Sequence, residues 1–384
     1  MKKVISMVLI VSMVGLMLPV KGENSNVITY DKAKTAMIEN NRTLKKLGFE
    51  ERKMFLNYNS AVQNTKNLRT DGVVYKFGKM EFFYSFDDYL RLDLTVMKEH
   101  MPEELKYYWG MMGNNKTVTE KTLALGLRDL YLGLMKSDKD IEIVNRKFGL
   151  AKNKHDINQL KFDQGLITKQ DLEESEYEQL KAEKAVDEAI RNRENMMRSL
   201  NSMLGVEIST VYETVKFDEF TRDLTFKPLE YYIENALNER LEIKNIEEEI
   251  RLKELKKGIF TSSRLFGKSY SLEDQYEDLV LEIEVLKVKL EKTKFDIENE
   301  IKKAYIEINE DLHNLESTTE TIKMQKRTLD KLKTQYDGGF IAKIVLDEME
   351  IGIDEIENAK ELVIYSYNTK IMKLEEAAGL GPAY

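Results

Sequence analysis

This chain repeats one short pattern, as Phe162-Asp-Gln-Gly-Leu-Ile-Thr-Lys169 and again as Tyr336-Asp-Gly-Gly-Phe-Ile-Ala-Lys343, and the repeat indicates its architecture. They match at one fixed shift of 174 residues (336 minus 162), and the same shift carries Gly205 onto Gly379. The interval from the glycine of each stretch to its closing glycine is 40 residues in both copies (205 minus 165 and 379 minus 339). Such an equal interval predicts two helices of equal span, each ended by a glycine.

Each stretch is typical of the reversal between two antiparallel helices. Gly165 and Gly339 can adopt the positive φ that a tight reversal requires. In the first copy, Thr168 is expected to cap the helix that follows, with Asp171 in the positively polarised first turn. Ala342 stands at the place of Thr168 in the second copy, so we expect no equivalent cap there.

The segment 268–337 contains neither glycine nor proline, and its apolar residues recur at alternating steps of three and four. That spacing is the heptad pattern of a coiled coil, and a helix of this length would extend roughly 100 Å. The sequence therefore predicts an all-α fold of two tandem, long antiparallel coiled-coil hairpins. The repeating positions are Leu279, Ile283, Leu286, Leu290, Ile297, Ile301, Ala304, Ile308, Leu312, Leu315, Ile322, Leu329, Leu332 and Tyr336.

The beginnings of the two copies also match, because residues 36–44 parallel residues 236–243 at a shift of 199 (243 minus 44). The shift thus grows by 25 (199 minus 174), and we place the extra residues of the first copy in the aromatic-rich stretch 71–113. The predicted division is a leader at 1–22, a first hairpin repeat at 23–205, a connector at 206–227 and a second repeat at 228–384.

The first 22 residues have the pattern of a secretory signal peptide. Lys2 and Lys3 precede an apolar run at 4–20, and Val20 and Gly22 supply small residues at the cleavage positions. The alternative is an anchor that stays attached, but the run is slightly short for a spanning helix. The chain has no cysteine, which excludes a lipid-modified cysteine and disulfide bonds.

Charge and motifs exclude several classes of function. A net charge of −9 argues against nucleic acid as a partner, because phosphate binding requires a cationic surface. The histidines His100, His155 and His313 lie far apart in the sequence and lack metal-ligand spacing. There is neither a P-loop nor a Gly-x-Ser-x-Gly motif. We therefore expect no enzyme activity, no cofactor and no metal site.

The order, duplication and spacing of these elements together resemble the TolC-like outer-membrane efflux proteins, also called outer-membrane factors. Each half of those proteins opens with Ala-Leu-x-x-Asn-x-x-Leu, carries a Tyr-x-x-Gly-hydrophobic-x-Ser/Thr-x-x-Asp-Leu tip and closes at Leu-Leu-Gly. The resemblance spans nearly the whole mature chain. The counterparts here are 36–44 and 236–243, then 162–172 and 336–346, then 203–205 and 377–379.

The resemblance implies a homotrimer whose twelve long helices form a hollow α-barrel. Such a duct exports solutes together with an adaptor (membrane fusion) protein and an energised pump in the cytoplasmic membrane. By the same resemblance, Tyr336, Asp347 and Glu348 would line an aperture. The tip residues that would contact the adaptor are Gly165, Leu166, Ile167, Thr168, Asp171, Gly339, Phe340, Ile341 and Lys343.

The sequence departs from that family where membrane strands are expected. A strand of a membrane barrel needs about 9–11 residues of alternating character. Residues 258–270 are too few for two such strands, and residues 73–86 allow one short hairpin at most. We therefore expect little or no β-barrel. The expected location is the cell envelope: the outer membrane by resemblance, or the outer face of the cytoplasmic membrane or the wall zone in a host without an outer membrane.

Two further hypotheses remain open at this level. In the first hypothesis, the chain is a secreted coiled-coil scaffold at the cell envelope. In the second, it is a regulator that docks on a hydrolase of the cell wall. In both cases it transports nothing. Neighbouring adaptor and pump genes would support transport, whereas neighbours linked to the cell wall would support a scaffold.

Overall fold

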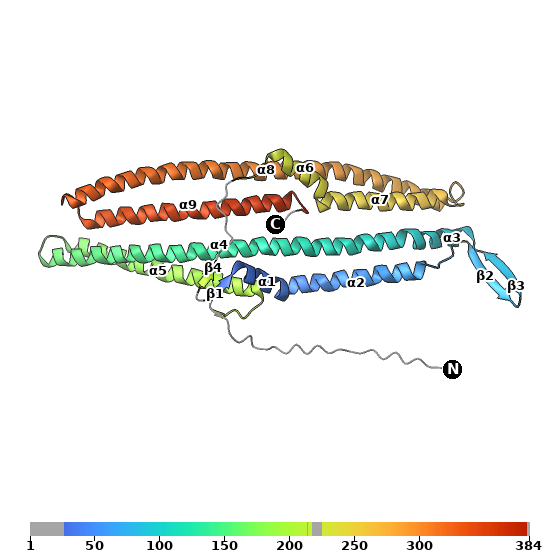
Figure 1. Cartoon of the computed structure of the whole chain (residues 1–384), viewed down its shortest axis with the longest axis horizontal. Coiled ribbons are helices and arrows are strands. Elements are labelled where there is room, and N and C mark those ends of the chain that lie inside the picture. Colours follow the sequence, from blue (N-terminus) through green and yellow to red (C-terminus); the bar gives the residue numbers. More distant parts are fainter. Residues whose placement is uncertain (1–26, 213, 217–224, 382–384) are drawn as a thin grey trace, which may run out of the picture.

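The computed structural model describes residues 27–212, 214–216 and 225–381. The described residues form an elongated molecule of long helices that run side by side (Figure 1). The predicted leader at 1–22 lies outside the described residues. The predicted all-α fold of two tandem helical hairpins is confirmed.

The first repeat consists of a short helix pair, a small β-hairpin and one long helical hairpin. Its elements are β1 (Val27–Thr29), α1 (Tyr30–Asn40), α2 (Arg42–Thr65), β2 (Gly72–Phe77), β3 (Met80–Ser85), α3 (Asp88–Thr95), the π-helical turn η1 (Val96–His100), α4 (Met101–Asp163) and α5 (Lys169–Leu204). Pro102 lies directly after the π-helical turn η1, where the amide of Met101 donates to the carbonyl of Val96, so the widened turn coincides with the missing N–H of the proline.

The second repeat has the same plan without the β-hairpin. Strand β4 (Thr214–Lys216) precedes it in the connector, and its own elements are α6 (Leu229–Glu239), α7 (Leu241–Ser262), α8 (Tyr270–Asp337) and α9 (Lys343–Ala377). The 68 residues of α8 match the predicted uninterrupted helix at 268–337 closely. Helices α5 and α9 have 36 and 35 residues, so the predicted equal spans are also confirmed.

The long helices form a layer that is one helix thick. Helices α4 and α8 run through both halves of the molecule (Figure 1). On the side of the hairpin ends the order across the layer is α5, α4, α9, α8, and on the other side it is α2, α4, α7, α8. Within the described part of the chain, no helix combines the length and the apolar character that crossing a membrane requires.

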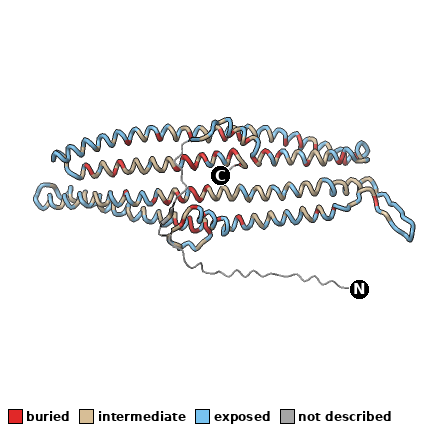
Figure 2. Tube along the Cα trace, in the orientation of Figure 1, coloured by how far each residue is buried: buried red, intermediate tan, exposed pale blue. Residues whose placement is uncertain are grey.

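Burial is concentrated at the middle of the molecule, where each repeat has its own apolar cluster (Figure 2). The clusters use equivalent positions: Leu200 of the first repeat corresponds to Leu374, and Leu204 corresponds to Ala378. Along α8, eight of the predicted heptad positions are buried. They are Leu279, Ile283, Leu286, Ile297, Ile301, Ile308, Leu315 and Ile322.

The strands of the described residues form two small sheets. Strand β1 pairs in parallel with β4, which ties the start of the first repeat to the segment that precedes the second. Strands β2 and β3 form an antiparallel hairpin with Phe77 opposite Met80. The expectation of one short hairpin within 73–86 is therefore met, whereas residues 258–270 contain the end of α7 and a turn.

One glycine prediction is wrong. Gly205 ends α5 with φ 68°, as expected, but α9 ends at Ala377 and Gly379 is absent from the positive-φ positions. The positive-φ glycine in this region is Gly381, with φ 131°. The physical reason is a different anchor, because the carbonyl of Leu380 accepts a hydrogen bond from the amide of Leu241 at 3.0 Å.

Candidate functional site

The two hairpin ends lie at the same end of the molecule and use the same backbone hydrogen bonds (Figure 1, left). We call residues 162–171 the first tip and residues 336–348 the second tip. Leu166 N–H donates to Lys161 O at 2.8 Å, and Phe340 N–H donates to Gln335 O at 2.8 Å. With φ of 70° at Gly165 and 75° at Gly339, each reversal is a Schellman motif.

The helix after the first tip begins with a reciprocal side-chain cap. Asp171 N–H donates to Thr168 Oγ1 at 3.2 Å, and Thr168 N–H donates to Asp171 Oδ2 at 2.9 Å. The Thr168 hydroxyl also donates to the carboxylate at 2.7 Å. Hydrogen bonds from the hydroxyl and the backbone of Thr168 lower the pKa of Asp171, because they stabilise the charged carboxylate.

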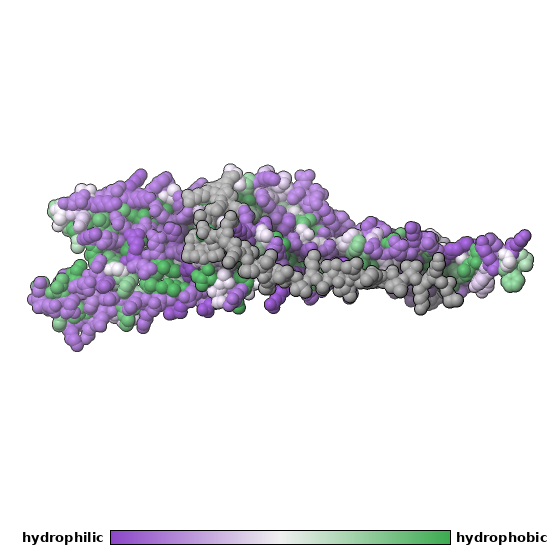
Figure 3. Space-filling view, turned by 60° about the horizontal axis from the view of Figure 1, so that its bottom comes forward, coloured by the Kyte–Doolittle hydropathy of each residue, from purple (hydrophilic) through white to green (hydrophobic). Residues whose placement is uncertain are grey.

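The second tip lacks such a cap, since Ala342 occupies the N-cap position of α9. Both tips expose one large apolar side chain: Leu166 is 67% exposed and Phe340 is 83% exposed. The next residues, Ile167 and Ile341, are half-buried. Each tip thus exposes one large apolar side chain directly after a glycine with positive φ. Figure 3 shows the two tips as separate lobes at the left.

The structure places the first tip beside the start of α9. Lys161 and Asp171 line one groove of about 540 Å³ together with Ala342 and Ile344. Glu348 pairs with Lys154 of α4.

The other predicted tip residues are at least partly accessible. Tyr336 and Lys343 are exposed, and Asp347 is half-buried. Contact with an adaptor and the lining of an aperture stay predictions for these residues and for Glu348.

A ladder of ion pairs, which was not predicted from the sequence, joins the two long hairpins. Lys147 of α4 pairs with Glu355 of α9, in register with the pair of Lys154 and Glu348. Arg146 and Asp354 form a further rung. The signal is present in the sequence, because the two lysines and the two glutamates are each seven residues apart. Exposed pairs of this kind contribute about 0–1 kcal/mol each.

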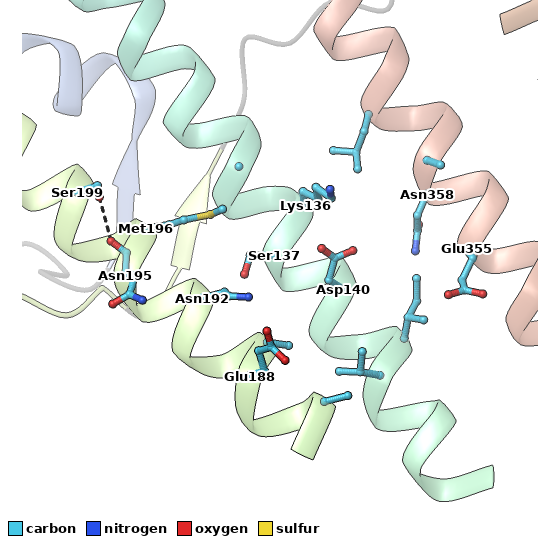
Figure 4. A pocket seen from close by; sticks show the side chains of 17 residues that line it. Lys136, Ser137, Asp140, Glu188, Asn192, Asn195, Met196, Ser199, Glu355 and Asn358 are labelled. Carbon is cyan, nitrogen blue, oxygen red and sulfur yellow. Dashed lines mark hydrogen bonds between the residues drawn. The ribbon is translucent and has the colours of Figure 1, made fainter. Parts of the chain in front are cut away.

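A groove of about 720 Å³ with a mixed polar and apolar lining lies between α4, α5 and α9, midway along the hairpins (Figure 4). Figure 4 shows Asp140 of α4, Asn192 of α5 and Asn358 of α9 on its walls. Ser199 Oγ donates to the backbone oxygen of Asn195 at 3.0 Å, as expected of a helical serine. The lining is a solvated surface between helices, and the residues drawn there suggest no nucleophile with a neighbouring base.

The three histidines occupy separate places. His100 faces α7, where burial lowers the pKa of its imidazole. A ring nitrogen of His155 lies 3.2 Å from Ser175 Oγ, and His313 is exposed beside Glu316. Across the described ranges, no group of three or more histidine or acidic side chains is arranged to hold a metal ion.

Comparisons with known proteins give one clear result, at the level of fold. No family model and no curated protein matches the sequence. The structure of CusC, described in terms of transmembrane channel formation, is similar over 92% of each chain, with 11% identity and a TM-score of 0.66. The outer-membrane channel OprN matches over 89% of this chain and 88% of its own, with 12% identity and a TM-score of 0.66.

The Campylobacter jejuni CmeC outer membrane channel covers 92% of this chain and 86% of its own, with 14% identity and a TM-score of 0.61. At such low identity the similarity is one of architecture. The chain has the fold of the TolC-like outer-membrane efflux channels.

Proposed function

We propose that this chain is the duct component of an export system and acts without enzymatic chemistry of its own. The observation that carries the proposal is a pair of matched helical tips at one end of a long, one-helix-thick layer with the TolC-like fold. A single layer has two open edges and encloses nothing. Several copies joined edge to edge would enclose a channel.

The outer edge formed by α8 supports such an assembly. Leu281, Val285, Val288 and Phe295 are each between 63% and 71% exposed. Their steps of four, three and seven repeat the heptad spacing on a face of α8 separate from the buried seam. A second exposed apolar seam on one helix is typical of a contact with another helix, because isolated exposed apolar residues show no such phase.

The opposite edge offers a matching surface on α2. Phe49 and Leu56 are exposed and seven residues apart, in the same half of the molecule as the α8 seam. A contact between α8 of one copy and α2 of the next is heterologous, and such contacts form a ring when the rotation closes. We propose a homotrimer, the assembly that the resemblance to TolC-like proteins implies.

The tips are the proposed docking site for an adaptor protein. Their exposed residues Leu166 and Phe340 project from rigid reversals, which suits insertion into apolar pockets of a partner. The energy for transport would come from a pump in the cytoplasmic membrane, with this chain exported to the cell envelope. The channels with the same fold are outer-membrane proteins, which favours that location.

The mass of the purified protein, measured by light scattering, tests the assembly. Val285→Glu with Val288→Glu places two charges in the α8 seam and should convert trimers to monomers. Lys287→Glu, on the same exposed stretch of α8 but with no seam residue three or four positions away, is the matched control and should leave the mass unchanged. A wild-type chain that stays monomeric at all concentrations would overturn the trimer.

Export by cells tests the function. Leu166→Asp with Phe340→Asp should abolish capture of the adaptor and raise the retention of exported solutes, with the helical content intact. Asp163→Ser with Asp337→Ser, at equivalent exposed positions in the two reversals, should change neither. Unchanged solute export after deletion of the whole gene would support the alternative of an envelope scaffold or regulator.

A further inference from the structure

The β2–β3 hairpin has one face made entirely of apolar and aromatic side chains. Cross-strand partners lie on the same face of an antiparallel pair, so the register assigns each residue to a face. On one face Val73 pairs with Tyr84, Tyr75 with Phe82, and Phe77 with Met80. These six side chains, which we call the aromatic face, are between 37% and 76% exposed.

The other face of the hairpin is mixed: it carries two charged side chains, the half-buried Val74 and Phe83, which is 54% exposed. Lys76 and Glu81 are cross-strand partners and form an ion pair at 2.6 Å. Phe83 packs against the backbone of Gly72, as the close approach of its ring shows, and the guanidinium of Arg69 lies 5.5 Å from the ring centre. The two faces therefore differ in composition: one carries six apolar or aromatic side chains, whereas the other includes an ion pair beside its two apolar side chains.

The hairpin projects beyond the ends of the neighbouring helices, at the end of the molecule opposite the tips (Figure 1). The space-filling view shows hydrophobic side chains at that extremity (Figure 3, far right). Its two strands have six residues each, which corresponds to about 20 Å. The hydrocarbon core of a bilayer is about 30 Å thick and requires about 9–11 residues per strand.

We propose that the hairpin lies flat on the surface of a lipid bilayer, with its aromatic face at the level of the headgroups and the first acyl carbons. Tyrosine and phenylalanine favour this depth, because their rings are apolar and the tyrosine hydroxyl stays hydrated. In this orientation the Lys76–Glu81 pair stays in water. An end-on insertion would bury that pair in hydrocarbon, which carries a large desolvation penalty.

The charge of the hairpin also fits an anionic lipid surface. Lys79 lies at its turn, and among the described residues it forms no ion pair. With Lys76 and Glu81 the hairpin carries a net charge of +1, on a chain whose total is −9. A lysine at the rim of an apolar face can reach the headgroups while its methylenes stay in the interface. A solvated loop would have no need of six clustered apolar side chains.

Vesicle binding by the exported chain, as the cell processes it, tests the inference. Tyr75→Ser with Phe82→Ser removes a cross-strand pair from the aromatic face. Val74→Ser with Phe83→Ser removes a pair from the other face and serves as the matched control. On vesicles of phosphatidylcholine and phosphatidylglycerol in equal parts, the first variant should bind about tenfold more weakly or worse. The control should stay within about threefold of wild type.

The orientation is measured with single tryptophans in a Trp109→Phe background, since Trp109 is the one native tryptophan. Phe77→Trp and Tyr84→Trp report from opposite ends of the strands. Lipids brominated at defined depths should quench both tryptophans at the same shallow depth. A tryptophan at 77 that lies much deeper than one at 84 would show end-on insertion and overturn the flat orientation.

Three further outcomes would each overturn lipid contact. They are no binding of the wild-type chain to any vesicle, equal losses in the two double variants, and a change of oligomer mass in the aromatic-face variant without vesicles. The last outcome would mean that the aromatic face covers another copy of the chain.

Discussion

The two repeats break their helices at equivalent positions with different chemistry. Asn41 separates α1 from α2 and Arg240 separates α6 from α7, at the repeat shift of 199 (240 minus 41), with φ of −61° and −60°. Asn41 Oδ1 accepts from the amides of Thr43 and Leu44 at 2.9 and 3.2 Å. It acts as an ordinary N-cap. Arg240 makes no cap; its buried guanidinium reaches other elements instead.

The guanidinium of Arg240 makes two hydrogen bonds each to Glu242 and Glu300, at 2.8–3.1 Å. It also donates to the carbonyl of Ala377 at 3.0 Å, next to the end of α9. The two tips show the same contrast, because the same Schellman backbone is followed by Thr168 in one copy and by Ala342 in the other. The backbone path is shared, while the polar groups that satisfy it differ between the copies.

The largest contrast is expected from Arg240→Ala against Asn41→Ala. Removal of Arg240 leaves two carboxylates and a carbonyl without their donor and should lower the free energy of unfolding by about 3 kcal/mol. The loss of an N-cap should cost about 1 kcal/mol. Denaturant unfolding followed by circular dichroism measures both. Equal losses would show that the two breaks are energetically equivalent after all.

A second test compares the cost of adding a side chain at the glycine of each reversal. Gly165→Val and Gly339→Val should each cost about 1–2 kcal/mol, because a β-branched residue disfavours positive φ while the surrounding space is open. Asparagine at the same positions should cost less. Gly352→Ala, inside α9 with open space around its Cα, is the control and should stabilise by about 0.5–1 kcal/mol. A much larger loss at one tip would break the equivalence.

Exchange of the cap between the tips gives a smaller, directional effect. Thr168→Ala should destabilise the chain by about 1 kcal/mol, since it removes the acceptor for the Asp171 amide. Ala342→Thr with Val345→Asp builds the same arrangement at the start of α9 and should stabilise by up to a similar amount. Hydrogen exchange of the first-turn amides locates the change. No gain in protection at the second tip would mean that its backbone differs from the first.

The smallest effect concerns pH. The pKa of Asp171 is lowered in the folded chain, so its cap contributes above the ordinary carboxyl pKa of about 3.9 and is lost as the pH falls through the lower folded value. The difference in stability between wild type and Asp171→Asn should therefore be constant at neutral pH and vanish in acid. A difference that persists below that range would contradict the role of the charged carboxylate.

Periodicity and glycine placement predicted most of the long elements. The helix at 270–337 and the positive φ of Gly165 and Gly339 follow from local rules, because heptad burial and left-handed turns depend on neighbours in sequence. The expected helix end at Gly379 was wrong, since the path of the chain there depends on Leu241, more than a hundred residues away. The residues around Gly379 do not indicate that contact.

The candidate site was predicted less completely. Thr168 and Asp171 form the cap that their spacing indicates, since a capping box is entirely local. The placement of Glu348 against Lys154 was missed, because it requires knowledge of which helices are neighbours. The buried Arg240 gave no sequence signal either; an arginine in a charged helix is ordinarily a surface residue.

The ion-pair ladder between α4 and α9 makes the molecule respond to ionic strength in two opposite ways. The ion pairs of Lys147 and Lys154 are exposed, so dissolved salt weakens their attraction. The Debye length is about 8 Å at physiological ionic strength and becomes shorter as salt is added. The apolar seams inside each hairpin respond oppositely to sulfate or phosphate salts, which strengthen apolar burial. A rise in such a salt should therefore strengthen the apolar packing inside each hairpin while it weakens the ion pairs between the two hairpins.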